Sequence, residues 1–211
     1  MSHLILQLAA SVFMIWGSLT TIRQTNLGQL LKAGLVVHIG YIITAASVPS
    51  EGISTVKWQI TAFYGIATLI MHAGIFTAGS VICRASGRRG LSALSGLYYR
   101  APMTAAAVLI LLVSLCGLPV SIGFIGKWMI LANAAQYNQY ATGALVLIST
   151  FFSYFYYFRL ARQMFMRTFD GREEVRMAVL PVIVIWLSAL LALVGGIMPT
   201  PLLNLLVTHF P

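Results

Sequence analysis

Residues 102–132 read PMTAAAVLILLVSLCGLPVSIGFIGKWMILA, an apolar run that is interrupted by glycines, a proline and a lysine. A helix that crosses a hydrocarbon core of about 30 Å needs about 20 mostly apolar residues, so this run is long enough to span a membrane. Within it, Gly117, Pro119, Gly123 and Gly126 loosen the backbone or remove a helical hydrogen bond. Because freed backbone groups cannot face lipid, the pattern predicts a broken transmembrane helix whose break faces protein or a water-filled cavity.

Lys127 lies beyond this break, still inside the apolar run. A charge near the centre of a bilayer costs about 2.5–3.5 kcal/mol on insertion scales, so an ionisable residue there is a functional candidate. A broken helix with a lysine two turns past the break is the pattern expected of an ion pathway. The alternative is that Lys127 snorkels toward the polar Asn133, which lies roughly 9 Å further along a helix.

The composition of the 211-residue chain is that of a membrane protein: 59% of its residues are hydrophobic, 8% are charged, and the mean hydropathy is +0.90. Soluble domains carry roughly 25% charged residues, so a water-facing surface cannot be built from this sequence. The composition excludes a soluble enzyme, a DNA-binding domain and a disordered tail. Although the net charge is +9, the charges lie in short clusters between apolar runs. We therefore expect the lipid bilayer as a partner and no nucleic acid.

The whole chain, residues 1–211, is predicted to be one all-α, polytopic membrane domain. Six stretches are apolar and long enough to cross a bilayer. The six predicted transmembrane helices cover residues 4–21, 30–48, 58–83, 102–132, 142–160 and 177–198. The connections are too short for a separate soluble domain, although residues 86–100 can form a short amphipathic helix on the membrane surface.

The positions of lysine and arginine predict the orientation of the chain in the membrane. The connections after the first, third and fifth predicted helices share one side of the membrane, and ten arginines lie there: Arg23, Arg84, Arg88, Arg89, Arg100, Arg159, Arg162, Arg167, Arg172 and Arg176. The opposite side carries only Lys57. Because positive charge collects on the cytoplasmic or matrix side, both termini are expected on the outer face.

Three further ionisable residues lie within predicted membrane helices. Lys32 is near the start of its helix, where snorkelling to the surface competes with a functional role. His38 and His72 lie well inside theirs, and a histidine titrates near neutrality and can relay protons in a wet cavity. The structural alternative for each histidine is a simple hydrogen bond to a neighbouring helix.

The sequence lacks the common motifs for binding a metal, a phosphate group or a redox cofactor. The sequence has no CxxC pair and no HExxH, so a zinc or thiol-redox site is not indicated. The segment GFIGK, residues 123–127, lacks the earlier glycine and the following Ser or Thr of a phosphate loop. A haem held axially by His38 and His72 is a rival interpretation, but only surface arginines are available for the haem propionates. We expect no cofactor and no metal in this chain.

The run at residues 96–131, GLYYRAPMTAAAVLILLVSLCGLPVSIGFIGKWMIL, resembles the antiporter-like membrane subunits of respiratory complex I and the related Mrp-type antiporter subunits. That family's SLxGxPxxxGFxGK pattern is matched here by residues 114–127. HIGY at residues 38–41, HAGIF at residues 72–76 and SYFYYFRLARQMF at residues 153–165 also resemble family segments. Lysine in GFIGK, where other members carry glutamate, is similar to the subunit-2 or N-type member.

The resemblance covers nearly the whole chain but only the C-terminal half of the family fold. It implies the second five-helix repeat, with one broken helix, and one terminal helix. A separate chain would then supply the first repeat, making a split subunit that contacts other membrane-arm subunits. One departure concerns the start of the histidine helix, where the family usually has Asp-x-Lys-Arg: Asn26, Gly28 and Gln29 stand there, and Lys32 has appeared.

The resemblance implies a non-redox subunit of NADH:ubiquinone reductase, the proton-translocating complex I, with quinone reduction driving proton transfer through Lys127, His38 and His72. The alternatives are a structural half-subunit that conducts no protons and an Mrp-type cation/proton antiporter subunit. A sodium-handling protein is expected to carry membrane carboxylates, whereas the four acids here lie in predicted loops. Because separately encoded halves suit gene transfer, the mitochondrial inner membrane is expected over the bacterial cytoplasmic membrane.

Overall fold

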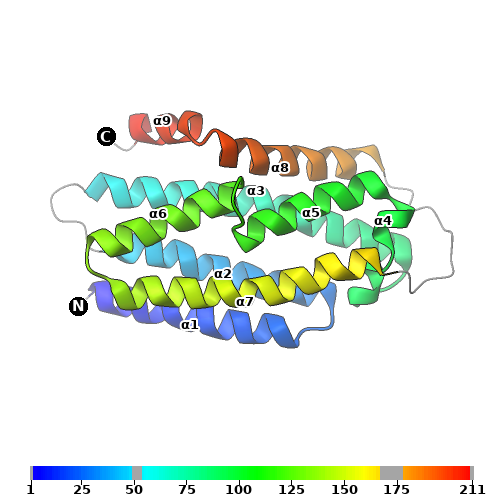
Figure 1. The fold of residues 1–211 in the computed structure, drawn as a ribbon, viewed down its shortest axis with the longest axis horizontal. Coiled ribbons are helices and arrows are strands. Elements are labelled where there is room, and N and C mark those ends of the chain that lie inside the picture. Colours follow the sequence, from blue (N-terminus) through cyan, green and yellow to red (C-terminus); the bar gives the residue numbers. More distant parts are fainter. Residues whose placement is uncertain (1, 49–53, 167–177, 210–211) are drawn as a thin grey trace.

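The computed structural model describes residues 2–48, 54–166 and 178–209. Five long helices run side by side in it (Figure 1), and all five are long and apolar enough to cross a membrane. They are α1 (Ser2–Arg23), α2 (Leu27–Ser47), α3 (Ser54–Ser86), α7 (Tyr140–Phe165) and α8 (Val179–Ile197). Two shorter helices, α5 (Pro102–Cys116) and α6 (Ile122–Gln136), follow one another along the bundle in the place of the predicted span at residues 102–132 (Figure 1).

The predicted all-helical fold is confirmed, since the described residues contain no strand beyond one isolated bridge between Asn26 and Gly90. The expected break at 102–132 is also present, because α5 ends at Cys116 and α6 begins at Ile122. The other predicted spans match helices whose ends differ by a few residues. The first residue of the sixth predicted span, Met177, lies outside the described residues.

Two segments differ from expectation. Residues 86–100 do not form one amphipathic helix but a 3₁₀ turn, η1 (Leu91–Leu94), and a single helical turn, α4 (Leu97–Arg100), because Gly96 between them has φ +66°. A further helix, α9 (Thr200–His209), was not predicted. It follows α8 after Pro199, and a residue before proline is disfavoured in the helical region, so α8 ends there.

The bundle buries two apolar clusters. The larger is centred on α3, α5, α7 and α8, and the smaller is formed by residues of α1, α2, α3, α6 and α7. α1 and α2 approach closely because Gly40 lies against α1: a Cβ there would be 2.7 Å from Cγ of Met14. The outer surface carries many exposed Leu, Ile, Val and Phe side chains, as expected of helices that face lipid.

The described arginines gather at one end of the bundle. Arg23, Arg84 and Arg162 lie in the last turns of α1, α3 and α7, which end on the same side (Figure 1). α1 begins and α9 ends at the opposite end (Figure 1). Three of the ten predicted loop arginines, Arg167, Arg172 and Arg176, lie outside the described residues. Which end faces the cytoplasm stays a prediction.

Candidate functional site

The helix break lies between α5 and α6 and is built by residues 117–121. Gly117 ends α5 in the left-handed region, with φ +76° and its amide donating to the carbonyl of Ser114, which is a common way to end a helix. Pro119 then prevents the helix from continuing. Ser121 caps α6, its Oγ accepting a hydrogen bond from the amide of Phe124 at 3.3 Å. The break is therefore stabilised by local caps at both ends.

The glycines at the break permit close contacts. A Cβ on Gly123 would lie 1.9 Å from the carbonyl oxygen of Ser114. A Cβ on Gly126 would lie 2.4 Å from Cδ2 of Tyr64. At Gly117 it would lie 2.8 Å from Cδ of Lys127. All three predicted glycines are thus sites of close contact, through which α6 packs tightly against the end of α5 and against α3.

Lys127 points back from α6 to the end of α5. Its Nζ donates hydrogen bonds to the carbonyls of Leu115 at 3.2 Å and Cys116 at 3.0 Å, and the residue is 4% exposed. The last carbonyls of a helix have no intrahelical partners and carry partial negative charge, so the end of α5 is a natural site for a cation. The ammonium group lies inside the bundle, and the snorkelling alternative is wrong.

The face of an aromatic ring completes the surroundings of the ammonium group. Nζ of Lys127 lies 5.0 Å from the ring centroid of Tyr41, within the range of a cation–π interaction. The four acidic residues of the chain are Glu51, Asp170, Glu173 and Glu174, and all lie outside the described residues. Among the described residues, therefore, only dipoles and a ring stabilise this charge.

His38 and His72 lie together, on α2 and α3, with ring centroids 4.9 Å apart in an edge-to-face arrangement. Nδ1 of His38 is 2.9 Å from the hydroxyl of Tyr64. Nδ1 of His72 is 2.9 Å from the carbonyl of Thr68. A carbonyl can only accept, so Nδ1 of His72 must carry the proton, and in the neutral ring Nε2 is a free acceptor. Nε2 of His72 is buried without a hydrogen-bond partner among the described residues.

The structure brings three of the four predicted ionisable residues into one interior region. Lys127 touches the ring of Tyr41, which packs edge-on against His38 with centroids 5.7 Å apart, and His38 contacts His72. Lys32, by contrast, is exposed and lines a separate cavity of about 240 Å³ that also includes Arg89. Its position agrees with the snorkelling interpretation.

Sequence reasoning missed a part of the site that belongs to α8. A Cβ on Gly196 would lie 2.4 Å from the backbone of Ser121, and one on Gly195 would lie 2.6 Å from Cδ1 of Ile122. The glycine pair therefore lets α8 pack directly on the break. The adjacent glycines at 195 and 196 could have predicted this contact, because small residues in an apolar membrane helix commonly mark a close helix contact.

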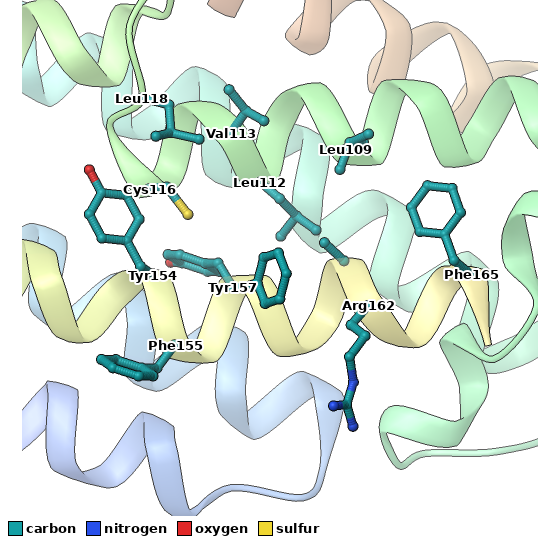
Figure 2. A pocket seen from close by; sticks show the side chains of 12 residues that line it. Leu109, Leu112, Val113, Cys116, Leu118, Tyr154, Phe155, Tyr157, Arg162 and Phe165 are labelled. Carbon is teal, nitrogen blue, oxygen red and sulfur yellow. The ribbon is translucent and has the colours of Figure 1, made fainter.

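A large apolar groove of about 690 Å³ lies between α5 and α7, next to the break (Figure 2). Cys116 and Leu118 line it near the break, and Arg162 and Phe165 line it toward the arginine-rich end (Figure 2). Its walls are almost entirely hydrophobic. The groove is suited to an apolar helix or lipid chain and offers little to a polar ligand.

The geometry argues against the haem alternative. The rings of His38 and His72 touch edge to face, which leaves no space for a macrocycle between them as two axial ligands. Within residues 2–48, 54–166 and 178–209, no group of three or more His, Cys, Asp or Glu side chains is placed to hold a metal ion.

Comparison with known proteins fits this arrangement. The family model described as NADH:quinone oxidoreductase/Mrp antiporter, TM, matches residues 1–153. The chain belongs to this family. Among members of this NADH:quinone oxidoreductase/Mrp antiporter family, NADH-quinone oxidoreductase subunit N of Paenibacillus sp. (strain JDR-2) is 41% identical over 197 residues, covering 92% of this chain and 38% of the relative. The protein of the same name from Bacillus anthracis is 31% identical, covering 96% of this chain and 40% of the relative.

Two solved structures have the same fold. A chain of respiratory complex I from Thermus thermophilus matches 95% of this chain over 44% of its own length, with 25% identity and a TM-score of 0.75. A chain of the Mrp complex from Dietzia sp. DQ12-45-1b matches 98% of this chain over 46% of its own length, with 19% identity and a TM-score of 0.86. The second likeness shows the fold alone.

This chain spans less than half the length of the relatives it matches. These relatives are bacterial, so they do not support the mitochondrial inner membrane expected above. The resemblance to the antiporter-like family is confirmed. The relatives named here are subunits of an enzyme complex, NADH-quinone oxidoreductase.

Proposed function

We propose that this chain is the proton-conducting half of a membrane-arm subunit of an NADH-quinone oxidoreductase, and that Lys127 is the residue that takes up and releases the proton. One observation carries the proposal: a buried lysine lies at a helix break, where its partners among the described residues are the carbonyls of Leu115 and Cys116 and the ring of Tyr41. A charge in this position is costly and is rare without a function. The relatives named as subunit N support the choice of complex.

The two histidines serve as the relay in this proposal. His72 offers Nε2 as an acceptor, and its ring contacts His38, which is paired with the hydroxyl of Tyr64. A proton that arrives at His72 Nε2 makes the ring cationic, and the proton on Nδ1 stays bound to the carbonyl of Thr68. His38 contacts both this ring and the ring of Tyr41, which lies beside the ammonium group of Lys127, so the lysine and the histidines lie close enough together to exchange protons through bridging water.

The decisive experiment is Lys127→Met in the assembled membrane complex, studied in inverted vesicles. Quinone reduction and proton uptake are measured together, and the number of protons moved per quinone reduced is the readout. We expect this ratio to fall while the complex still assembles. Lys57→Met is the matched control, because Lys57 lies in the first turn of α3 and outside the interior region. Unchanged proton transfer in Lys127→Met would support the structural half-subunit instead.

The antiporter alternative predicts a different ion. A sodium site is expected to use carboxylate oxygens, which hard cations prefer, and no acidic residue lies among the described residues. Proton movement driven by a sodium gradient in vesicles, without quinone reduction, would favour that alternative.

We further infer that the first five-helix repeat comes from a polypeptide segment outside this chain, because the relatives are more than twice as long. The groove between α5 and α7 would receive one of its apolar helices. A cysteine introduced at Phe155, on the groove wall, is expected to cross-link to that segment in native membranes. Cross-linking to lipid analogues alone would overturn this assignment.

A further inference from the structure

A chain of hydroxyl groups leads from the ring of Tyr41, beside Lys127, toward α7 and α1. The hydroxyl of Tyr41 on α2 donates to Oγ of Ser149 on α7 at 3.1 Å. Oγ of Ser149 is 3.2 Å from Oγ of Ser18 on α1. Thr150 Oγ1 lies 3.2 Å from the same tyrosine hydroxyl. Three helices thus contribute one continuous set of hydrogen-bonded hydroxyls, in which Tyr41, Ser149 and Ser18 are buried and Thr150 is partly exposed.

Tyr41 is the link between this set and the candidate proton site. Its ring lies under the ammonium group of Lys127, 5.0 Å from Nζ, and its hydroxyl reaches α7. The same ring packs edge-on against His38. Tyr41 is completely buried. A single residue therefore touches the lysine, a histidine and the first serine of the hydroxyl chain.

These hydroxyls differ from most other serines and threonines of the bundle. Most Ser and Thr side chains in helices satisfy their own helix, as Ser11 does with the carbonyl of Gln7 and Ser153 does with that of Thr150. Ser18 and Ser149 are bonded to each other across the α1–α7 interface instead. Simple burial of a small polar residue would not require this cross-helix pairing.

The chain of hydroxyls ends at a small cavity between α1 and α7. This cavity has a volume of about 60 Å³ and is lined by Ser18, Ser149 and apolar side chains that include Met14 and Phe152. A single water needs about 10–15 Å³, so the cavity is large enough for water, and the two serines provide the polar partners that water requires.

We propose that Tyr41, Ser149 and Ser18 form a hydroxyl branch through which protons pass between Lys127 and the α1–α7 surface. The branch rests on the proposed role of Lys127. In each step a hydroxyl oxygen accepts one proton and releases its own to the next oxygen, so no ionised hydroxyl remains. A water bridging Nζ and the tyrosine hydroxyl would take the proton from the lysine ammonium, and water in the α1–α7 cavity would receive it at the other end.

The test is a set of variants that remove one hydroxyl each, made in the assembled complex and measured as the initial rate of proton uptake into vesicles during quinone reduction. Tyr41→Phe keeps the ring beneath Lys127 and removes only the hydroxyl. We expect Tyr41→Phe and Ser149→Ala each to slow proton transfer about tenfold, a barrier increase of about 1.4 kcal/mol. Ser149→Thr keeps a hydroxyl at the same place and is expected to restore most of the rate.

Two control variants separate relay from packing. Tyr156→Phe removes a buried tyrosine hydroxyl that has no hydrogen-bond partner among the described residues. Ser153→Ala removes a serine one turn beyond Ser149 that bonds only its own helix. Both control variants are expected to transfer protons at the wild-type rate. If either control also transferred protons slowly, the slower transfer in Tyr41→Phe and Ser149→Ala would be an effect of packing, and the proposed branch would be refuted.

The outcomes distinguish the branch from the function on which it rests. If Lys127→Met stops proton transfer while Tyr41→Phe and Ser149→Ala retain the full rate, the branch is refuted and the proposed function stands. If Lys127→Met leaves transfer intact, the proposed function fails and the branch fails with it. If the Tyr41→Phe complex does not assemble, Ser149→Ala and Ser149→Thr still test the branch. Equal rates of proton transfer in these two variants would refute it.

Discussion

Replacing Gly126 by alanine would test how tightly the broken helix holds the histidine relay. The added Cβ would lie 2.4 Å from Cδ2 of Tyr64, where ordinary contact begins at 3.4 Å, so the ring must move by about 1 Å. Tyr64 is completely buried, and its hydroxyl is 2.9 Å from Nδ1 of His38. A displacement of that size away from the histidine would take the pair beyond hydrogen-bond distance.

The energetic estimate for Gly126→Ala combines two opposing effects. Overpacking a filled core typically costs about 1–3 kcal/mol, and alanine is favoured over glycine in a helix by about 1 kcal/mol. We therefore expect a net loss of roughly 0–2 kcal/mol in stability, together with a clear loss of proton transfer. We expect proton transfer to fall by more than the small loss of stability explains, because the displaced Tyr64 is the hydrogen-bond partner of His38.

Thermal unfolding of the detergent-solubilised complex and proton uptake in vesicles are the two assays. Gly65→Ala is the matched control: Gly65 lies on the same helix as Tyr64, and a Cβ there would meet nothing within 4 Å. That control is expected to raise the melting temperature slightly and leave transfer unchanged. If Gly126→Ala behaved like Gly65→Ala in both assays, the argument from the close contact with Tyr64 would be refuted.

Three more predictions follow from the break itself. Gly123→Ala places a Cβ 1.9 Å from the carbonyl oxygen of Ser114, so the two helices must separate, and we expect little assembled complex on a native gel; normal assembly would contradict the geometry. Val120 is β-branched with φ +72° and is 57% exposed, so Val120→Gly is expected to raise stability by about 1 kcal/mol, measured as the unfolding midpoint. Lys127→Arg keeps the charge but cannot release a proton at ordinary pH, so we expect assembly without proton transfer; a pumping variant would show that the charge alone suffices.

The helix break was predictable because its signals are local. Gly117 and Pro119 disfavour a continuous helix wherever they stand in an apolar run. The direction of the Lys127 side chain also has a local cause, since side chains on a helix tilt toward its N-terminus, which here is the break. Helix α9 was missed because it is too short to span a bilayer by itself, and the prediction searched for spans.

The hydroxyl contacts of Tyr41 could not be predicted, because they depend on how distant helices pack. Tyr41 and Ser149 are 108 positions apart in the sequence, and no periodicity within either helix identifies the other. The same holds for Gly196 and Ser121, where the glycine pair indicates a close contact without indicating its partner. Residue types showed which positions were unusual, and only the tertiary structure showed which of them meet.

The position of the lysine charge has a consequence for energy conversion. Lys127 binds the end of α5, near the middle of the bundle's length (Figure 1). One elementary charge that crosses a membrane potential of 100 mV gains or loses about 2.3 kcal/mol. A charge halfway across experiences roughly half of that, enough to change the ratio of loaded to unloaded sites about sevenfold. With only dipoles and a ring around it among the described residues, this site would respond to the membrane voltage as well as to the proton concentration on either side.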